Sequence, residues 1–553
     1  MRQEPHPISG ALYEEVGDGV VRVLDQTGGK SGLFRWDGTW LEGNLTYADP
    51  HMLLYIGGPN LPEGKDIFWG FLPPAEDAST VVPAGVGSMP GDQMPQRIVA
   101  KYKRDPGLKT DQGMRSAAHV DQDFLLDNDR RPDLVPAVFR LQSPMPGGPV
   151  RIDTARFFEK KYHDLEVEKL WKRTWQMACR EDDIPNIGDF HVYEIAHLSF
   201  LIVRTGEHEF KAHYNACLHR GRLLREHDGA RAREFRCPYH GWSWNIDGTL
   251  KEITTEWDFP GVREHVCTLP SAQVGRWGGF IFINPDPDAM SLEEFLGPVM
   301  LQHYAKYKME NRYKQAHVTR VIGANWKVGT EAFLESYHVI ATHPQVMLTG
   351  GDLAECRYDV FGNFGRAAHV SAGRSGASPQ RGLFVTPEHV LATYRQSADF
   401  QRAYLRGIIG DEVEQFSDAE LNDSSFNHVF PNLHPWSGWS RIVFRFRPNG
   451  DNPDECIQDV MLLAPWPEGK PKPPPRPIRH LKMNESWTDA PELASLARIL
   501  DQDVLNMPKL QAGLKTKQPS YVWYSAYQEG KIRNFHRNYD RAMGLEGVGD
   551  SQE

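Results

Sequence analysis

Long hydrophobic runs, clusters of basic residues and a signal peptide are all missing from this sequence. No window approaches ~20 consecutive apolar residues, and the first ten residues, MRQEPHPISG, lack both a basic start and an apolar stretch. These absences predict that no segment spans a membrane, and they favour a cytoplasmic location. The formal net charge is −11 and the lysines and arginines are scattered. The sequence therefore argues against nucleic acid as a general partner.

Cysteine is scarce, with six in 553 residues. Four of the six stand alone, without the spacing of a disulfide framework; they are Cys179, Cys267, Cys356 and Cys456. We expect these four to be buried free thiols in a reducing compartment. No internal repeat is visible. The length and the 40 % hydrophobic composition suffice for several domains with sizeable cores.

The other two cysteines each lie beside a histidine and ahead of a glycine. Cys217-x-His219 opens the stretch CLHRG, and Cys237-x-x-His240 opens the stretch CPYHGW. Paired thiolates and imidazoles indicate either a tetrahedral zinc or an iron–sulfur cluster. Zinc fingers usually pair like with like, whereas a two-iron cluster with Cys on one iron and His on the other needs one of each from two loops. The mixed pairs therefore favour a Rieske [2Fe–2S] centre.

A second group of ligand-type residues lies in GTEAFLESYHVIATHP. A helix is expected here, on which Glu335 and His338 share a face, whereas His343 does not. Pro344 favours an end to the helix after His338, and then both imidazoles can converge on one ion. Two histidines and one carboxylate with open positions are typical of a non-haem Fe(II) site that activates O₂. A third ligand is still needed.

Together these motifs resemble the catalytic α subunit of Rieske non-haem iron oxygenases, over about residues 155–545. The resemblance lies in CLHRG, CPYHGW and the following NIDGTL, and in NWK, YH and HP of the second group. It implies that Cys217 and Cys237 hold the buried ferric iron, and that His219 and His240 hold the outer, reducible iron.

The same resemblance implies a third ligand on a late helix, in QDVLNMPKLQAGL. It selects Asp503, with Asp501 as the main rival. Glu335 matches the acid that passes electrons from a neighbouring subunit to the mononuclear iron, although it could instead orient His338. Most relatives read Glu-Asn-Phe where this chain has Ala332 in the middle position, so the analogy does not indicate a substrate.

The strand and helix patterns predict an α+β fold. We expect an N-terminal extension over 1–150, β-rich to about residue 75 and loop-like after that, whose role the resemblance does not explain. A small antiparallel-β Rieske domain with a leading helix capped by Asp153 should occupy 151–295. A helix-covered antiparallel-sheet catalytic domain with the mononuclear iron should occupy 296–545, and a tail 546–553.

In function, the resemblance implies a terminal oxygenase that hydroxylates or dealkylates an aromatic or other apolar small molecule with O₂. It implies one [2Fe–2S] cluster and one Fe(II) per chain. Electrons would come from NAD(P)H through a ferredoxin or a flavin reductase. A homotrimer is expected, with or without a small β subunit. One alternative is a Rieske electron-transfer or redox-sensing protein with a non-catalytic mononuclear site. Another is an interaction module in 1–150 with attached redox activity.

Overall fold

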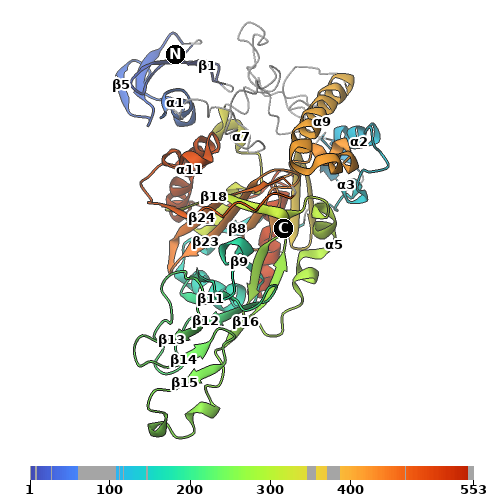
Figure 1. Cartoon of the computed structure of the whole chain (residues 1–553). Helices are drawn as coiled ribbons and strands as arrows, with labels where there is room; N and C mark the ends of the chain where they lie inside the picture. The colour runs from blue at the N-terminus through green and yellow to red at the C-terminus, as the bar shows by residue number, and fades with distance from the viewer. Residues whose placement is uncertain are drawn as a thin grey trace.

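The structure is a computed structural model, and it describes residues 2–6, 9–25, 28–59, 108–110, 113–115, 118–144, 147–344, 356–369, 387–467 and 469–545. Figure 1 shows a small N-terminal sheet at one end, a large central sheet covered by helices, and a smaller β domain that reaches to the other end. This arrangement confirms the α+β expectation. Among these described residues, no helix is both long and apolar enough to cross a membrane.

The Rieske-type domain is built on a six-stranded antiparallel sheet in the order β10-β11-β12-β16-β17-β9. Its strands β11 and β17, LSFLIVR and FIFIN, are buried along nearly their whole length, which explains their continuous apolar runs. A three-stranded sheet, β13-β14-β15, extends from it. The strands are β9 Gln176–Arg180, β10 Phe190–Ile195, β11 Leu198–Arg204, β12 Phe210–Tyr214, β13 Glu234–Arg236, β14 Ser243–Asn245, β15 Leu250–Glu252, β16 Ser271–Trp277 and β17 Phe280–Asn284.

The segment that leads into this domain is helical, but it is not the single helix that its spacing predicts. The Asp153 side chain accepts a hydrogen bond from the Ala155 N–H, as expected of an N-cap, and opens a short 3-10 turn over Thr154–Phe157. Phe158 then leaves the helical conformation, with φ −145°. Helix α4 (Lys160–Glu166) restarts after it, and a π-helical turn over Val167–Trp171 follows.

The central sheet has eight strands in the order β19-β20-β21-β22-β23-β24-β18-β25, and all its pairs are antiparallel except β18 with β25. The strands are β18 Arg312–Ile322, β19 Cys356–Phe361, β20 Phe364–His369, β21 His428–Val429, β22 Leu433–Pro435, β23 Ile442–Asn449, β24 Asn452–Pro465 and β25 Arg479–Leu481. The helices around this sheet are α5 Leu292–Tyr304, α6 Trp326–Ala332, α7 Val339–Thr342, α9 Pro387–Ile409, α10 Asp418–Leu421, α11 Leu496–Thr516 and α12 Gly530–Met543. A two-stranded pair joins β8 (Arg151–Asp153) to β26 (Tyr521–Trp523).

The N-terminal module, defined here as the described residues from 2 to 59, is a five-stranded meander in the order β1-β2-β3-β4-β5 with one helix. The strands are β1 Gln3–Pro5, β2 Leu12–Gly17, β3 Val20–Leu24, β4 Ser31–Arg35 and β5 Trp40–Gly43. The stretch HMLLYIGG lies in the part of the extension expected to be β-rich, but it forms helix α1 (Pro50–Gly57) instead. Asp49 caps it by accepting hydrogen bonds from the N–H groups of His51 and Met52, and Pro50 occupies its first turn.

The region expected as loop between about 76 and 150 contains further regular structure, so that expectation was wrong for the part described. It holds β6 Leu108–Thr110, β7 Gly113–Arg115, α2 Ala118–Asp127 and α3 Ala137–Arg140. The segment packs against the catalytic domain through two polar contacts. Arg130 makes a bidentate ion pair with the buried Asp418, and the Ser143 N–H donates a hydrogen bond to the Asp359 carboxylate at 2.8 Å. Residues 118–144 are thus packed as part of the catalytic domain. The expected tail, 546–553, lies outside the described residues.

Candidate metal centres

Two loops of the Rieske-type domain repeat one backbone pattern, as their matching sequences predict. In the first, the Cys217 N–H donates to the Arg222 carbonyl and the Gly221 N–H donates back to the Cys217 carbonyl, both at 2.9 Å. The second loop has the same two bonds at 2.8 and 3.1 Å, from Cys237 to Trp242 and from Gly241 to Cys237. Each closing glycine adopts a left-handed conformation, with φ 77° at Gly221 and 82° at Gly241. This explains the glycine after each histidine.

The four ligand-type side chains of these loops are gathered together. Cys217 and Cys237 are both buried, and the rings of His219 and His240 lie 4.6 Å apart between centroids. Burial raises the pKa of the Cys217 thiol, the N–H of His219 lowers it, and the neighbouring Cys237 thiol raises it further. His219 stacks on Trp242, and within the described part of the chain its buried Nδ1 has no hydrogen-bond partner. A buried imidazole nitrogen left unpaired beside two thiols suits a metal ligand.

The spread of these four residues distinguishes a cluster from a single zinc. Four ligands of one tetrahedral ion all lie near one another. Among the residues that the structure describes, however, the group that brings at least three ligand atoms within 4.8 Å of one another is His338, His343 and Asp503. The two thiols and two imidazoles do not converge on one point in this way. Their arrangement therefore fits a two-iron cluster better than zinc.

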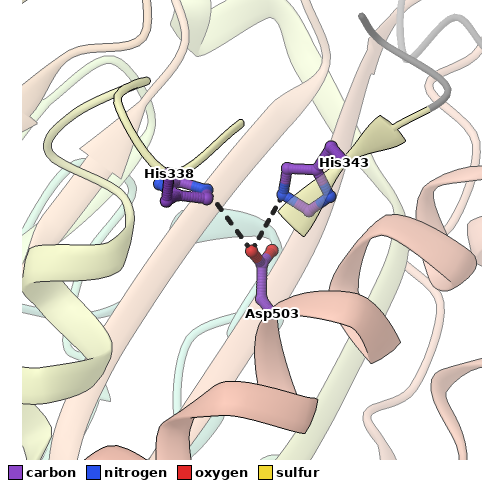
Figure 2. Close-up of side chains that lie close together, drawn as sticks. All are labelled: His338, His343 and Asp503. Atoms are coloured by element: carbon purple, nitrogen blue, oxygen red, sulfur yellow. Dashed lines mark hydrogen bonds and ion pairs between the residues drawn. The ribbon is translucent and has the colours of Figure 1, made fainter. Parts of the chain in front are cut away.

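The second site is formed by His338, His343 and Asp503, whose side chains point toward one another in Figure 2. Asp503 comes from α11, and the two histidines flank the short helix α7. The Asp503 Oδ1 lies 3.0 Å from the His343 Nε2 and 3.5 Å from the His338 Nε2. His343 and Asp503 are buried, and His338 is half-buried. Two imidazole nitrogens and one carboxylate around one point are the ligand set of a non-haem Fe(II) site.

The local backbone differs from the helix expected here. Helix α6 ends at Ala332, before Glu335, so Glu335 and His338 do not share the face of one continuous helix. His338 instead caps the N-terminus of α7, which ends at Thr342 just before His343. The Glu335 carboxylate accepts a hydrogen bond from the His338 N–H at 2.9 Å, which helps to start the new helix. The expected end of a helix after His338 was therefore wrong: the break lies before His338, and the separate one-turn helix α7 connects the two histidines.

In both histidines, the Nδ1 atom, which lies on the side of the ring away from Asp503, forms a hydrogen bond with a side-chain oxygen. The His338 Nδ1 lies 2.6 Å from the Glu335 Oε1, and the His343 Nδ1 lies 2.9 Å from the Gln502 Oε1. Since these oxygens can only accept, each Nδ1 carries a proton. In the neutral ring, the Nε2 lone pair then faces Asp503. This is how metal-binding histidines are usually oriented. Sequence reasoning missed Gln502, although it is the neighbour of a candidate ligand.

Charges at the second site also favour a cation. Burial alone would lower the pKa of His338, but the Glu335 and Asp503 carboxylates outweigh it and raise that pKa to about 10. Burial would raise the pKa of Asp503, whereas His343 and His338 lower it to about 2. The carboxylate is therefore ionised and attracts positive charge at neutral pH. A bound metal ion would displace the proton from His338 and take its place.

Asp501, the rival ligand, points elsewhere. Its carboxylate accepts hydrogen bonds from the Ser486 hydroxyl and from the Trp487 N–H, and it lies 3.4 Å from the Arg320 guanidinium. Asp501 therefore stabilises the packing of α11 against the preceding turn at Ser486 and Trp487. Ala332, where relatives commonly have Asn, is half-buried at the end of α6 and packs against the main core.

Comparisons with known proteins agree with both centres. The Rieske [2Fe-2S] domain family matches residues 174–262, and the ring hydroxylating alpha subunit (catalytic domain) family matches residues 301–545. The alpha subunit of biphenyl 2,3-dioxygenase from Rhodococcus jostii is 30 % identical over 212 residues, which is 36 % of this chain and 45 % of the relative. The oxygenase subunit of glycine betaine monooxygenase from Pseudomonas aeruginosa is 30 % identical over 196 residues, 35 % of this chain and 44 % of the relative.

Solved structures share the fold at low identity. Naphthalene 1,2-dioxygenase with indole in its active site aligns with a TM-score of 0.53 and 19 % identity, over 74 % of this chain and 96 % of that one. A quaternary ammonium Rieske monooxygenase in complex with L-carnitine aligns with a TM-score of 0.52 and 16 % identity, over 72 % and 97 %.

These findings define a protein with a Rieske domain joined to a mononuclear iron domain. The chain belongs to the ring hydroxylating alpha subunits, the catalytic subunits of Rieske non-haem iron oxygenases. Members of this class use a Rieske cluster and a mononuclear iron. The chain spans less than half the length of the curated relatives quoted above, and both family matches leave residues 1–173 outside.

Proposed function

We propose that this protein is a terminal oxygenase, in which Cys217, His219, Cys237 and His240 hold a [2Fe–2S] cluster and His338, His343 and Asp503 hold one Fe(II). The observation that carries the proposal is the second site. Both histidines turn Nε2 toward a buried carboxylate while Glu335 and Gln502 hold the opposite nitrogens. A protein that only carried electrons would not need this arrangement. It therefore argues against the electron-transfer or redox-sensing alternative.

When bound, the iron would supply O₂ activation. The chain's own residues contribute orientation and charge. Glu335 and Gln502 keep the proton of each imidazole on Nδ1, which leaves the Nε2 lone pairs for the metal. The Asp503 carboxylate would balance part of the metal's positive charge, and because Asp503 is buried this electrostatic attraction would be strong. Three protein ligands would leave open positions on the metal for O₂ and substrate.

Electrons would cross between subunits. Figure 1 places the cluster-binding loops near β13 and β14, and the second site near α7 and α11, with the large central sheet between them. This separation argues against direct electron transfer from the cluster to the mononuclear iron within one chain. In a head-to-tail ring of three, the cluster of one subunit can face the iron of the next. Glu335, which already bonds His338, would then connect His240 of one subunit to His338 of its neighbour.

The outside partners follow from the class of enzyme. A ferredoxin or flavin reductase would supply electrons from NAD(P)H, and a small β subunit would complete the assembly if one is present. A cytoplasmic location remains a prediction. The substrate would be an aromatic or other apolar small molecule, as for the biphenyl and naphthalene dioxygenases named above. The glycine betaine and carnitine monooxygenases make quaternary ammonium compounds the competing class to test.

The test begins with metal content and spectroscopy of protein made with adequate iron. About three irons per chain and the EPR signal of a His-ligated [2Fe–2S] cluster after reduction are expected. A panel of aromatic and quaternary ammonium compounds, supplied with ¹⁸O₂ and a surrogate reductase, should then give a product that contains ¹⁸O. Stoichiometric zinc in place of iron would overturn the proposal. Full iron loading without any oxygenated product over the whole panel would favour the electron-transfer alternative.

Transfer between subunits has its own test. A His240→Ala chain lacks a working cluster and an Asp503→Ala chain lacks a working iron, so neither should turn over alone. Co-expressed with different tags and purified through both, the two should form mixed trimers in which one junction is intact. Some turnover should then return. Mixed trimers that carry their remaining metals and stay inactive would refute the route.

A further inference from the structure

The N-terminal module, which both family matches leave outside, packs beside the mononuclear site. Helix α1 lies next to α11, and the Arg498 guanidinium of α11 donates a hydrogen bond to the Pro59 carbonyl at 2.6 Å. Figure 1 shows the module above α7, which the two candidate histidine ligands flank, and above α11, which carries Asp503. The contact therefore places the N-terminal module against the helix that carries Asp503.

One side chain of the module is buried in this region with an unused polar atom. His51, on the first turn of α1, is only 7 % exposed. Its Nδ1 faces the Asp49 carboxylate at 3.8 Å, and its buried Nε2 has no hydrogen-bond partner among the residues that the structure describes. Asp49 is itself fixed, because it accepts from the His51 and Met52 N–H groups while its own N–H donates to the Tyr13 hydroxyl. His51 is thus held in one place by a rigid helix start.

His51 also lies within the electrostatic reach of the candidate ligands. Burial lowers the pKa of His51, and after Asp49 the groups whose charges act on it most are His343 and Asp503. His51 is not part of the group whose ligand atoms lie within 4.8 Å of one another, so it is not a fourth ligand at the same point. It stands close to the site but outside the metal's own ligand set.

A buried imidazole nitrogen without a partner is costly, since buried polar groups in proteins are nearly always hydrogen-bonded. Next to a site that must admit a substrate, the substrate itself can supply the missing partner. A neutral imidazole can donate to or accept from an oxygen atom, whereas it gains nothing from a hydrocarbon. An oxygen-containing group on the substrate would therefore suit the buried His51 Nε2 better than a hydrocarbon.

We propose that the N-terminal module closes one side of the mononuclear site, and that the His51 Nε2 hydrogen-bonds a hydroxyl, carbonyl or carboxylate oxygen of the substrate. The proposal rests on the proposed function. It gives residues 2–59 a role in substrate positioning. It also narrows the aromatic substrate class to compounds with an oxygen substituent.

The experiment compares His51→Ala and His51→Asn with the wild type in the full chain. His6→Asn is the matched control, because His6 is a second buried histidine of the same module that faces the opposite oxygen of Asp49 at 3.7 Å and packs against Tyr13. With the compound that forms product in the panel above, His51→Ala should raise KM about tenfold, as expected for the loss of one hydrogen bond. His51→Asn, which keeps a polar group, should retain more of the affinity. His6→Asn should leave KM unchanged.

A second readout does not depend on turnover. Nitric oxide added to the Fe(II) protein reports the surroundings of the metal by EPR, and benzoate and toluene serve as matched probes with and without an oxygen group. Benzoate should shift the wild-type signal more than toluene, and His51→Ala should remove that difference while keeping the full iron content. Unchanged KM and unchanged EPR responses in both His51 variants would overturn this inference alone. A wild-type protein that binds no mononuclear iron would overturn the proposed function, and this inference with it.

Discussion

The two candidate metal centres are assembled in opposite ways. The cluster residues lie between Cys217 and His240, in two loops whose geometry is fixed by hydrogen bonds inside each loop. The mononuclear site joins His343 to Asp503 across 160 positions of sequence, and it exists only if α7 and α11 dock correctly on the central sheet. The first centre is therefore a local property of the chain, whereas the second is a property of the whole catalytic domain. Changes far from the metals should affect the second centre more.

The sharpest test of this difference is Asp503→Ala. It should abolish product formation and most mononuclear iron binding, because it removes the carboxylate that both histidines face. The reduced-cluster EPR signal should stay unchanged, since the two centres share no residue. Iron analysis and EPR on one preparation give both answers.

Asp501→Ala is the matched control on the same helix. It removes acceptors for the Ser486 hydroxyl and the Trp487 N–H, which should cost about 1–3 kcal/mol of unfolding free energy. Mononuclear iron should be retained. If Asp501→Ala loses the iron and Asp503→Ala keeps it, the ligand assignment is wrong by two residues.

The same contrast explains what could be predicted from sequence. The cluster loops were recognisable because all their determinants, including Gly221 and Gly241, stand in two short motifs. The strands of the Rieske-type domain were recognisable from continuous apolar runs. Asp503 could be chosen over Asp501 only through the family resemblance, because nothing local distinguishes two aspartates two residues apart on one helix.

Features that depend on distant contacts were missed. Helix α1 was mistaken for a strand because its apolar residues run together, and the cap at Asp49 was overlooked. The break after Ala332 depends on packing that no local pattern records. The docking of residues 118–144 depends on Asp359 and Asp418, which lie more than 200 positions further along the chain.

Removal of residues 1–150 should have the next largest effect, and it should affect the mononuclear site but not the cluster. A chain starting at residue 151 loses the Arg130 guanidinium from the buried Asp418 and the Ser143 N–H from the buried Asp359. Each loss leaves a buried carboxylate short of a partner, at about 1–3 kcal/mol. Arg402 still pairs with Asp418, which limits the damage.

We therefore expect this truncated protein to keep its cluster signal while its catalytic domain unfolds at lower denaturant concentration and binds less mononuclear iron. A chain starting at residue 118 is the control, because it keeps both contacts. Equal stability of the two truncated chains would show that the segment 118–150 is dispensable for the catalytic domain.

A buried acid in the catalytic domain should make the stability of the protein depend on pH. Burial raises the pKa of Glu331 to about 8. Arg156 donates to the His536 Nδ1, so the His536 Nε2–H donates to the Glu331 Oε1, at 2.7 Å. The Glu331 Oε2 lies 2.9 Å from the Tyr524 hydroxyl. A protonated Glu331 can form hydrogen bonds with both the His536 ring and the Tyr524 hydroxyl.

The sign of the effect follows from the raised pKa. Between the usual 4.5 and about 8 the folded state binds the extra proton, so stability falls as pH rises through this window. Glu331→Gln keeps the geometry of the protonated acid and cannot titrate. Its stability relative to wild type should therefore rise with pH, by up to about 1.4 kcal/mol per pH unit. Denaturant unfolding at pH 5 and pH 8 measures this; a difference that does not change with pH would show that Glu331 is ionised in the folded protein.

The smallest expected effects are at the two loop glycines, and they test whether the cluster loops are as equivalent as their hydrogen bonds suggest. An alanine at either position must adopt the left-handed conformation, at about 1–2 kcal/mol. At Gly221 an added Cβ meets no atom within 4 Å, so Gly221→Ala should show this backbone cost alone. At Gly241 the added Cβ would lie 2.8 Å from the Thr254 Oγ1, so Gly241→Ala should cost more and should disturb the cluster spectrum. Gly221→Asn should be milder than Gly221→Ala, because Asn tolerates this conformation better. Equal losses in the two alanine variants would mean that Thr254 moves aside, and the two loops would then be equivalent in energy as well as in backbone pattern.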